Sequence, residues 1–229
     1  MPEPFRVDVT PSEPVTAIVY PAAARDAADI SLILAHGAGA NQRSGFMVQF
    51  AGALASRGIE IITFNFIYSE AGRRLPDPND KLEACWRSVI AACRSGQIGG
   101  NGERRKLAIG GKSMGGRIAT QVAAADPDAL AGLVLLGYPL HPPGRPDKPR
   151  SKHLPEIRTP MLFVQGSRDA FGTPDELAPI VATLTAPVRL CVVEGGDHSF
   201  KVAKKAARSQ DQVYEFILDE IERWLRALP

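Results

Sequence analysis

The sequence has few cysteines, three in 229 residues, and no cysteine or histidine spacing such as CxxC or HExxH that is typical of metal sites. So few thiols cannot form the disulfide framework of a small secreted protein. Cys85 and Cys93 lie eight residues apart in a helical pattern, which separates them by about 12 Å along the axis, too far for a disulfide. We therefore expect buried free thiols in a reducing compartment, no metal and no other cofactor.

The sequence also lacks long apolar runs and an excess of either charge. No hydrophobic stretch exceeds the length of a strand, and residues 1–14 hold no signal-peptide core. The 27 basic and 25 acidic residues are mixed along the chain and give a net charge of +2. These absences predict a cytoplasmic protein with no nucleic-acid partner and no membrane partner, and they leave its oligomeric state open.

A hydrophobic fraction of 45% and a charged fraction of 23% predict one globular domain over residues 1–229. Short apolar, β-branched segments alternate with segments of helical periodicity. We expect strands at residues 5–9, 15–20, 30–35, 59–66, 106–109, 130–136, 160–165 and 188–193, and helices at 44–56, 79–94, 114–125, 174–184 and 209–228. This alternation predicts an α/β fold whose parallel sheet is covered by helices on both faces, with ligands bound at the carboxyl ends of the strands.

Residues 110–116, which read GGKSMGG, follow one expected strand and precede a helix rich in small residues. They contain the pattern G-x-S-x-G, with Ser113 at its centre. A tight strand-to-helix turn of this kind pushes the serine Oγ above the sheet, and glycines are needed where a side chain would clash with nearby backbone. Ser113 is therefore the candidate nucleophile. A phosphate-binding P-loop does not fit, because its first glycine would fall on Lys106.

A serine nucleophile needs a histidine base and an acid that orients the histidine, and in this architecture they follow in the order serine, acid, histidine. Asp169 comes directly after the strand expected at 160–165, and His198 follows the strand expected at 188–193. His141 and His153 precede the acid in a proline-rich loop and fail this order. Asp197, adjacent to His198, is interpreted as a turn residue. The candidate catalytic residues are thus Ser113, Asp169 and His198.

The same chemistry needs an oxyanion hole of backbone N–H groups. One donor is expected from Met114, the residue after the nucleophile. The second is expected from the loop after the strand at 30–35, which reads HGAGA and lets the backbone approach a substrate closely. Ala38 is the preferred donor and Gly37 the alternative, whereas His36 is interpreted as a residue that braces the loop.

These motifs together resemble the α/β-hydrolase superfamily. They are HGAG at 36–39, GKSMGG at 111–116, GSRD at 166–169 and GDH at 196–198. The segments FNFIY at 64–68, GRR at 72–74 and YPLHPPG at 138–144 look closer still to a small cap-less group related to dienelactone hydrolase and to the KANSL-like hydrolase domain. The resemblance implies an eight-stranded, mostly parallel sheet and hydrolysis of ester, thioester or amide bonds. Dienelactone hydrolase carries a nucleophilic cysteine where this chain has Ser113, so its substrate is not carried over.

Residues 137–159 occupy the place where many relatives insert a cap domain. This segment is too short and too rich in proline to form a helical cap, which predicts an open or lightly covered site. Possible substrate-binding residues at its rim, besides Gly37, are Tyr68, Arg73, Arg74, His141 and Arg145, which would favour an anionic or polar substrate. Loop ion pairs are an equally good interpretation of these side chains.

The sequence as a whole predicts a serine hydrolase that cleaves a carboxylic ester or a related acyl bond of a small molecule through an acyl-enzyme. A non-catalytic scaffold on the same fold is the alternative from a different class of protein. Acyl transfer or peptide hydrolysis by the same three residues is also left open, because the shape of the pocket selects the acceptor.

Overall fold

The computed structural model of the chain describes residues 4–23, 27–99, 105–126 and 130–229, so the first three residues of the N-terminal segment considered above lie outside it. The described strands are β1 (Pro4–Thr10), β2 (Glu13–Tyr20), β3 (Ile30–Ala35), β4 (Glu60–Phe64), β5 (Lys106–Lys112), β6 (Gly132–Leu136), β7 (Met161–Gly166) and β8 (Val188–Val193). They form an eight-stranded sheet in the order β1-β2-β4-β3-β5-β6-β7-β8. The pairs β1–β2 and β2–β4 are antiparallel, and all other neighbours are parallel.

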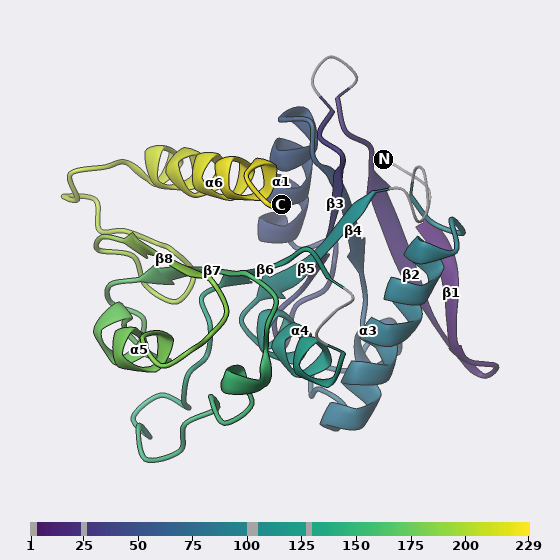
Figure 1. Cartoon of the computed structure of the whole chain (residues 1–229), viewed down its shortest axis with the longest axis horizontal. Coiled ribbons are helices and arrows are strands. Elements are labelled where there is room, and N and C mark those ends of the chain that lie inside the picture. The colour runs from purple at the N-terminus through teal and green to yellow at the C-terminus, as the bar shows by residue number, and fades with distance from the viewer. Residues whose placement is uncertain (1–3, 24–26, 100–104, 127–129) are drawn as a thin grey trace.

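Helices cover both faces of this sheet. They are α1 (Gly45–Ser56), α2 (Ile67–Glu70), α3 (Asn79–Arg94), α4 (Met114–Ala125), α5 (Pro174–Val181) and α6 (Gln210–Arg226). Figure 1 shows α1 and α6 on one face and α3, α4 and α5 on the other. Both α5 and α6 begin with a capping box, formed by Thr173 with Glu176 and by Ser209 with Gln212, which satisfies backbone N–H groups that would otherwise lack acceptors.

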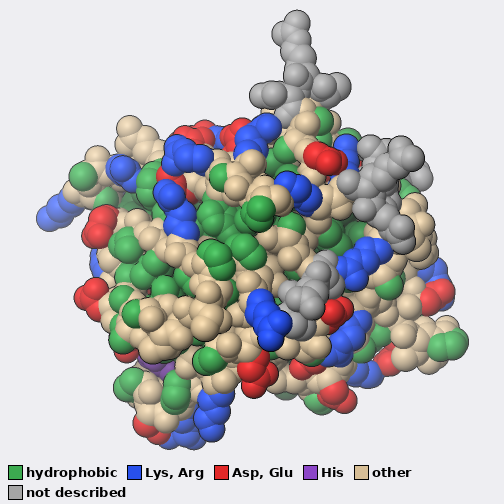
Figure 2. Space-filling model, in the orientation of Figure 1, with side chains coloured by type: hydrophobic (Ala, Val, Ile, Leu, Met, Phe, Trp, Pro, Cys, Tyr) green, Lys and Arg blue, Asp and Glu red, His purple; other side chains and the backbone are tan. Residues whose placement is uncertain are grey.

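Two apolar cores lie between the sheet and its helix layers. Every residue of β3, β4, β6 and β7 is buried, as expected for parallel strands covered on both sides. One core contains Phe64, Trp86 and Tyr138, and the other contains Phe50 and Phe200. The visible face in Figure 2 carries Lys and Arg side chains interspersed with Asp and Glu. No helix in the described ranges combines the length and the apolar character needed to cross a membrane.

The order of the strands indicates at which edge of the sheet a ligand is expected to bind. The chain leaves β3 toward β4 on one side and later returns to β5 on the other side of β3, so the crossover direction reverses between β3 and β5. In open α/β sheets, ligands bind at the carboxyl ends of the strands where this reversal occurs. The loop with Gly37 and Ala38 follows β3, and Ser113 follows β5, so both candidate elements lie at this point.

The fold predicted from the sequence is confirmed, and α3 and α4 have the predicted bounds. The strand expected at 59–66 is shorter, because β2 pairs with β4 only as far as Phe64 and the chain then turns into α2. The turn is stabilised by Asn65, whose side chain accepts the Gln42 N–H at 2.8 Å. Residues 137–159 contain a short 3-10 helix (η2, Leu154–Glu156) and no longer helix, in agreement with the absence of a helical cap.

Candidate active site

Ser113 occupies a strained turn between β5 and α4. Its backbone has φ 51° and ψ −116°, outside the usual regions for a residue with a side chain, and its N–H donates to the Leu136 carbonyl at 2.9 Å. A Cβ on Gly111 would lie 2.3 Å from the Ala35 carbonyl oxygen, and one on Gly115 would lie 2.5 Å from the same atom. Gly111 and Gly115 are therefore required by the close approach of β3.

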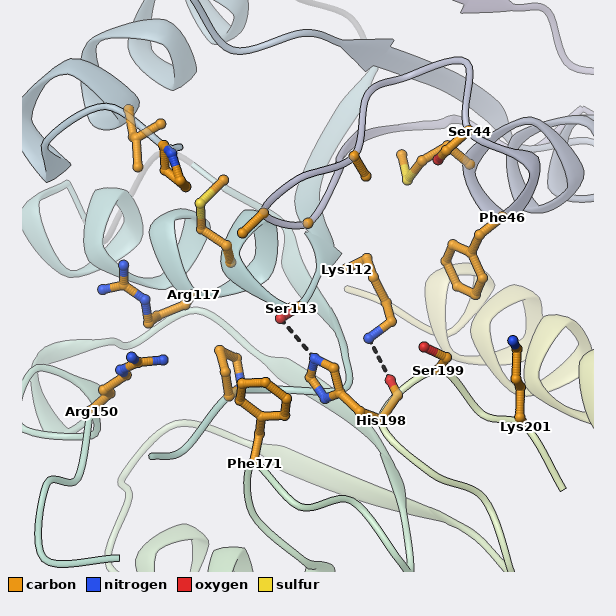
Figure 3. Close-up of a pocket in the computed structure, with 18 of the residues that line it drawn as sticks. Ser44, Phe46, Lys112, Ser113, Arg117, Arg150, Phe171, His198, Ser199 and Lys201 are labelled. Carbon is orange, nitrogen blue, oxygen red and sulfur yellow. Dashed lines mark hydrogen bonds between the residues drawn. The ribbon is translucent and has the colours of Figure 1, made fainter. Parts of the chain in front are cut away.

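Ser113, His198 and Asp169 form one continuous chain of hydrogen bonds. The Ser113 Oγ lies 2.8 Å from His198 Nε2, and His198 Nδ1 lies 2.8 Å from Asp169 Oδ2. Figure 3 shows the serine and the imidazole directed toward each other inside the pocket. The Asp169 side chain is fully buried, whereas that of His198 is 21% exposed. The structure thus brings together three side chains that are 29 and 85 residues apart in sequence.

The carboxylate of Asp169 is held by donors on both of its oxygens. Oδ1 accepts the Phe171 N–H at 2.8 Å, and Oδ2 accepts the Gln165 side-chain amide at 2.9 Å as well as the His198 imidazole. Gln165 is itself oriented, because its Oε1 accepts the Tyr138 N–H at 2.8 Å. Gln165 is not among the residues predicted from the sequence, where its signal is a polar residue near the end of an apolar strand.

The loop that carries His198 is held by contacts of Lys112, Phe171 and Asp197. Lys112 donates from Nζ to the His198 carbonyl at 2.5 Å, and Phe171 stacks on the imidazole with ring centres 4.1 Å apart. Burial lowers the pKa of Lys112 to about 8, although Asp169 and Asp197 oppose this shift. Asp197 accepts the N–H groups of Ser199 and Lys201 at 2.8 and 2.9 Å, which is the turn role expected for it. Lys112 and Phe171 are not among the site residues predicted from the sequence.

The expected oxyanion donors lie beside the nucleophile. Met114 is the first residue of α4, where a backbone N–H has no helical acceptor. A Cβ on Gly37 would lie 3.5 Å from the Ser113 Cβ, so the loop after β3 runs alongside the turn. Gly37, Ala38, Ser113 and Met114 all line the same cavity. This placement keeps Met114 and Ala38 as the proposed donors.

His36 braces this loop from below. It is fully buried, its Nδ1 lies 2.9 Å from the Gly37 carbonyl, and its Nε2 accepts the Phe66 N–H at 3.3 Å. Because Nε2 accepts, the proton of the neutral ring is on Nδ1 and is donated to Gly37. Burial lowers the pKa of His36 to about 4, although the Gly37 carbonyl opposes this shift.

The buried neutral His36 predicts a loss of stability in mild acid. Below pH 6.5 the unfolded state binds a proton that the folded state does not take up until about pH 4, so the free energy of unfolding falls between these values. The loss amounts to about 3 kcal/mol, from 1.36 kcal/mol per pKa unit. Urea denaturation from pH 7 to pH 4 measures it. His36→Gln is the matched variant, and an equally steep decline in that variant would contradict the assignment.

A cavity of about 760 Å³ opens above Ser113 and His198. Its apolar lining comes from Phe46, Met47, Leu82, Met114, Pro139, Phe171 and Tyr214, and its ionisable lining from Asp77, Lys112, Arg117, Arg150, His198 and Lys201. The candidate nucleophile and base thus face a space of the size that binds small molecules.

The structure does not bring the other predicted rim residues to this cavity. Tyr68 is buried under the loop after β3, with its hydroxyl 3.5 Å from the Gly37 carbonyl. Arg73 pairs with Asp77 at 2.7 Å, and Arg74 is exposed. Tyr68 lies within α2 and the two arginines follow it, and none of the three lines the cavity.

The two rim candidates from the proline-rich loop also have partners elsewhere. His141 is buried, with its ring nitrogens 2.8 Å from the Pro142 carbonyl and 3.2 Å from Glu176. Arg145 is bound to Asp147 at 3.1 Å. Together with Arg73, these residues form loop contacts, which was the alternative interpretation of the sequence.

The cysteines are buried and free, as expected. Burial raises the pKa of Cys85 and of Cys191 to about 11 and that of Cys93 to about 12, which keeps their thiols protonated. Within the residues that the structure describes, no group of three or more His, Cys, Asp or Glu side chains is arranged to hold a metal ion.

Comparison with known proteins identifies the family of the chain. A profile described as an alpha/beta hydrolase domain matches residues 28–226. A serine hydrolase without a lid from Xanthomonas campestris is 20% identical, with a TM-score of 0.73 over 99% of this chain and 96% of that one. Dienelactone hydrolase from Anabaena variabilis is 18% identical, with a TM-score of 0.67 over 99% and 98%. The esterase domain of a Rhodothermus marinus protein is 14% identical, with a TM-score of 0.72 over 99% and 98%. The chain belongs to the α/β-hydrolase family, and the resemblance found in its sequence is confirmed.

Proposed function

We propose that this protein is a serine hydrolase that cleaves carboxylic esters of small molecules. The observation that carries the proposal is the unbroken hydrogen-bond chain from Ser113 through His198 to Asp169, with 2.8 Å at each step. A serine alcohol becomes a useful nucleophile when a base is within hydrogen-bond distance and that base is oriented by a third group. A non-catalytic scaffold protein would not need these three side chains to be linked by hydrogen bonds.

In the proposed reaction, Ser113 Oγ attacks the ester carbonyl carbon while His198 Nε2 takes the serine proton. Asp169 holds the Nδ1–H tautomer and stabilises the imidazolium that forms. The N–H groups of Met114 and Ala38 bind the negative charge that develops on the carbonyl oxygen. The tetrahedral intermediate collapses, the alcohol leaves with the proton from His198, and an acyl-enzyme remains.

The acyl-enzyme is then hydrolysed by the same residues. Water attacks its carbonyl carbon while His198 takes a proton from the water, and the proton returns to Ser113 Oγ as the carboxylic acid leaves. Asp197 has no part in these steps, because its carboxylate is used by the N–H groups of the turn.

Two features support an ester as the substrate class. The cavity above Ser113 is open and partly apolar, and Phe46, Met47 and Tyr214 in its lining are available to an acyl or alcohol group. Some solved structures of similar fold are esterases, including the Rhodothermus marinus domain and a cold-adapted esterase from an Arctic intertidal metagenomic library. An alcohol is also a better leaving group than an amine, so an ester bond is easier to cleave than an amide bond. Ester hydrolysis is therefore the first activity to measure.

The test is hydrolysis of 4-nitrophenyl esters from acetate to octanoate, with release of 4-nitrophenolate followed by absorbance. We expect turnover above the rate in buffer, and an initial burst if loss of the acyl group is the slower step. Rates equal to those in buffer for every chain length would contradict the proposed function.

A further inference from the structure

Two arginines in the cavity are unaccounted for by the reaction described above. Arg117 lies on the first turn of α4, four residues after Ser113, and Arg150 lies in the loop between β6 and η2. Figure 3 shows their guanidinium groups close together, on the side of Ser113 away from Phe46 and Lys201. Both side chains are half-buried. One end of the cavity therefore carries two arginines, and the opposite end carries Phe46 and Lys201.

Among the residues that the structure describes, no carboxylate is paired with either of these two arginines. Arg117 donates to the Asn79 side-chain oxygen at 3.2 Å, a neutral acceptor, and in the described ranges neither arginine is within ion-pair distance of an acidic group. Asp77 is the acidic residue in the cavity lining, and it is already paired with Arg73 at 2.7 Å. Glu83, which also acts on Arg117 from a distance, is paired with Arg87.

This arrangement is unfavourable unless an anion is present. Burial lowers the pKa of Arg117, and the charge of Arg150 lowers it further, because two like charges stand close together in a partly desolvated space. Guanidinium groups remain charged in proteins, so the repulsion is not relieved by loss of a proton. Their planar fork of N–H donors matches the two oxygens of a carboxylate.

We propose that Arg117 and Arg150 bind a carboxylate of the substrate while its ester group lies at Ser113. The inference rests on the proposed function and deepens it, because it defines the substrate class as an ester that carries a free carboxylate. The rim arginines first suggested by the sequence, Arg73 and Arg74, are not part of this site, and Arg117 and Arg150 take the role.

Matched ester pairs test the inference on both sides of the scissile bond. On the acyl side, mono(4-nitrophenyl) glutarate is compared with 4-nitrophenyl 5-methylhexanoate, in which an isopropyl group replaces the carboxylate. On the alcohol side, 4-(butanoyloxy)benzoate is compared with its methyl ester. We expect Arg117→Gln and Arg150→Gln each to lower kcat/KM for the charged member of at least one pair by about tenfold to a hundredfold. The neutral member is expected to change less than about threefold.

Arg158→Gln is the control, since Arg158 is an exposed arginine outside the cavity. It should leave both members of each pair unchanged. Arg150 lies on a loop and Arg117 on a helix, and circular dichroism shows whether each variant folds. If one of the two variants is misfolded, the kinetics of the other still test the carboxylate site. Equal losses on charged and neutral esters, or no loss on either pair, would overturn the carboxylate site.

Binding measured without turnover separates this inference from the proposed function. In a Ser113→Ala background, calorimetric titration with mono(4-nitrophenyl) glutarate and with 4-(butanoyloxy)benzoate should give a Kd that Arg117→Gln and Arg150→Gln raise at least about tenfold for one of the two. If wild type hydrolyses neutral esters but neither probe depends on these arginines, the inference fails and the proposed function stands. If wild type hydrolyses no ester but the binding of a probe depends on the two arginines, the carboxylate site stands and the proposed ester hydrolysis fails.

Discussion

Ser113→Ala is expected to lower kcat/KM for a 4-nitrophenyl ester by about 10⁴-fold or more, because no other group can form the acyl-enzyme. The Ser113 hydroxyl is 2.8 Å from the His198 base, and its strained backbone holds it at the cavity. Steady-state kinetics at several ester concentrations measures the change.

Ser199→Ala is the matched control for the nucleophile. Ser199 also lines the cavity and is exposed, but no imidazole nitrogen lies within hydrogen-bond distance of its hydroxyl. We expect this variant to keep kcat/KM within about threefold of wild type. If Ser113→Ala retained most of the activity, or if Ser199→Ala lost it, Ser113 would not be the nucleophile.

Asp169→Asn is expected to lower kcat by about 10⁴-fold, the second of the two largest effects. Both carboxylate oxygens accept N–H donors, from Phe171 on one side and from Gln165 on the other. Gln165 cannot turn its amide over without losing the Tyr138 N–H, so the asparagine NH₂ would face a donor in either orientation. With the NH₂ at the Oδ2 position, His198 loses the acceptor that fixes its tautomer, and with the NH₂ at the Oδ1 position the Phe171 N–H loses its acceptor. In both orientations the negative charge that stabilises the imidazolium is gone.

Asp197→Asn separates the two neighbouring acids. Asp197 precedes His198 directly, yet one oxygen, Oδ1, accepts both turn N–H groups, and the asparagine carbonyl oxygen can accept them as well. We expect kcat within about threefold of wild type and a similar melting temperature. Comparable losses in Asp169→Asn and Asp197→Asn would remove the distinction between them.

The elements that were predictable from sequence depend on local pattern. The apolar stripe of α3 repeats at helical spacing along the helix and so predicts it from neighbouring residues alone. The glycines on either side of Ser113 likewise predict a tight turn at the end of one strand. That Ser113, Asp169 and His198 would lie close together was predictable too, because parallel strands place their carboxyl ends at one edge whatever their separation in the chain. A short list of residues at those ends therefore contained Asp169 and His198.

The residues that were missed depend on tertiary contacts. Gln165 has meaning only because β7 places its amide against Asp169, and Arg150 only because the proline-rich loop folds back over α4. Tyr68 and Arg73 were expected at the rim because they follow a strand end. Tyr68 is instead buried in α2, and Arg73 is paired with Asp77 without lining the cavity itself. Neither feature has a periodic signal in so few residues.

The most direct test of the account is the intact mass of wild type and of Ser113→Ala after incubation with a fluorophosphonate. In this reaction the serine Oγ forms a bond to phosphorus and fluoride leaves, which requires the activated hydroxyl and no natural substrate. The account predicts one adduct on wild type and none on Ser113→Ala. The absence of an adduct on folded wild type, or an adduct of equal yield on the variant, would contradict it and would favour the scaffold alternative.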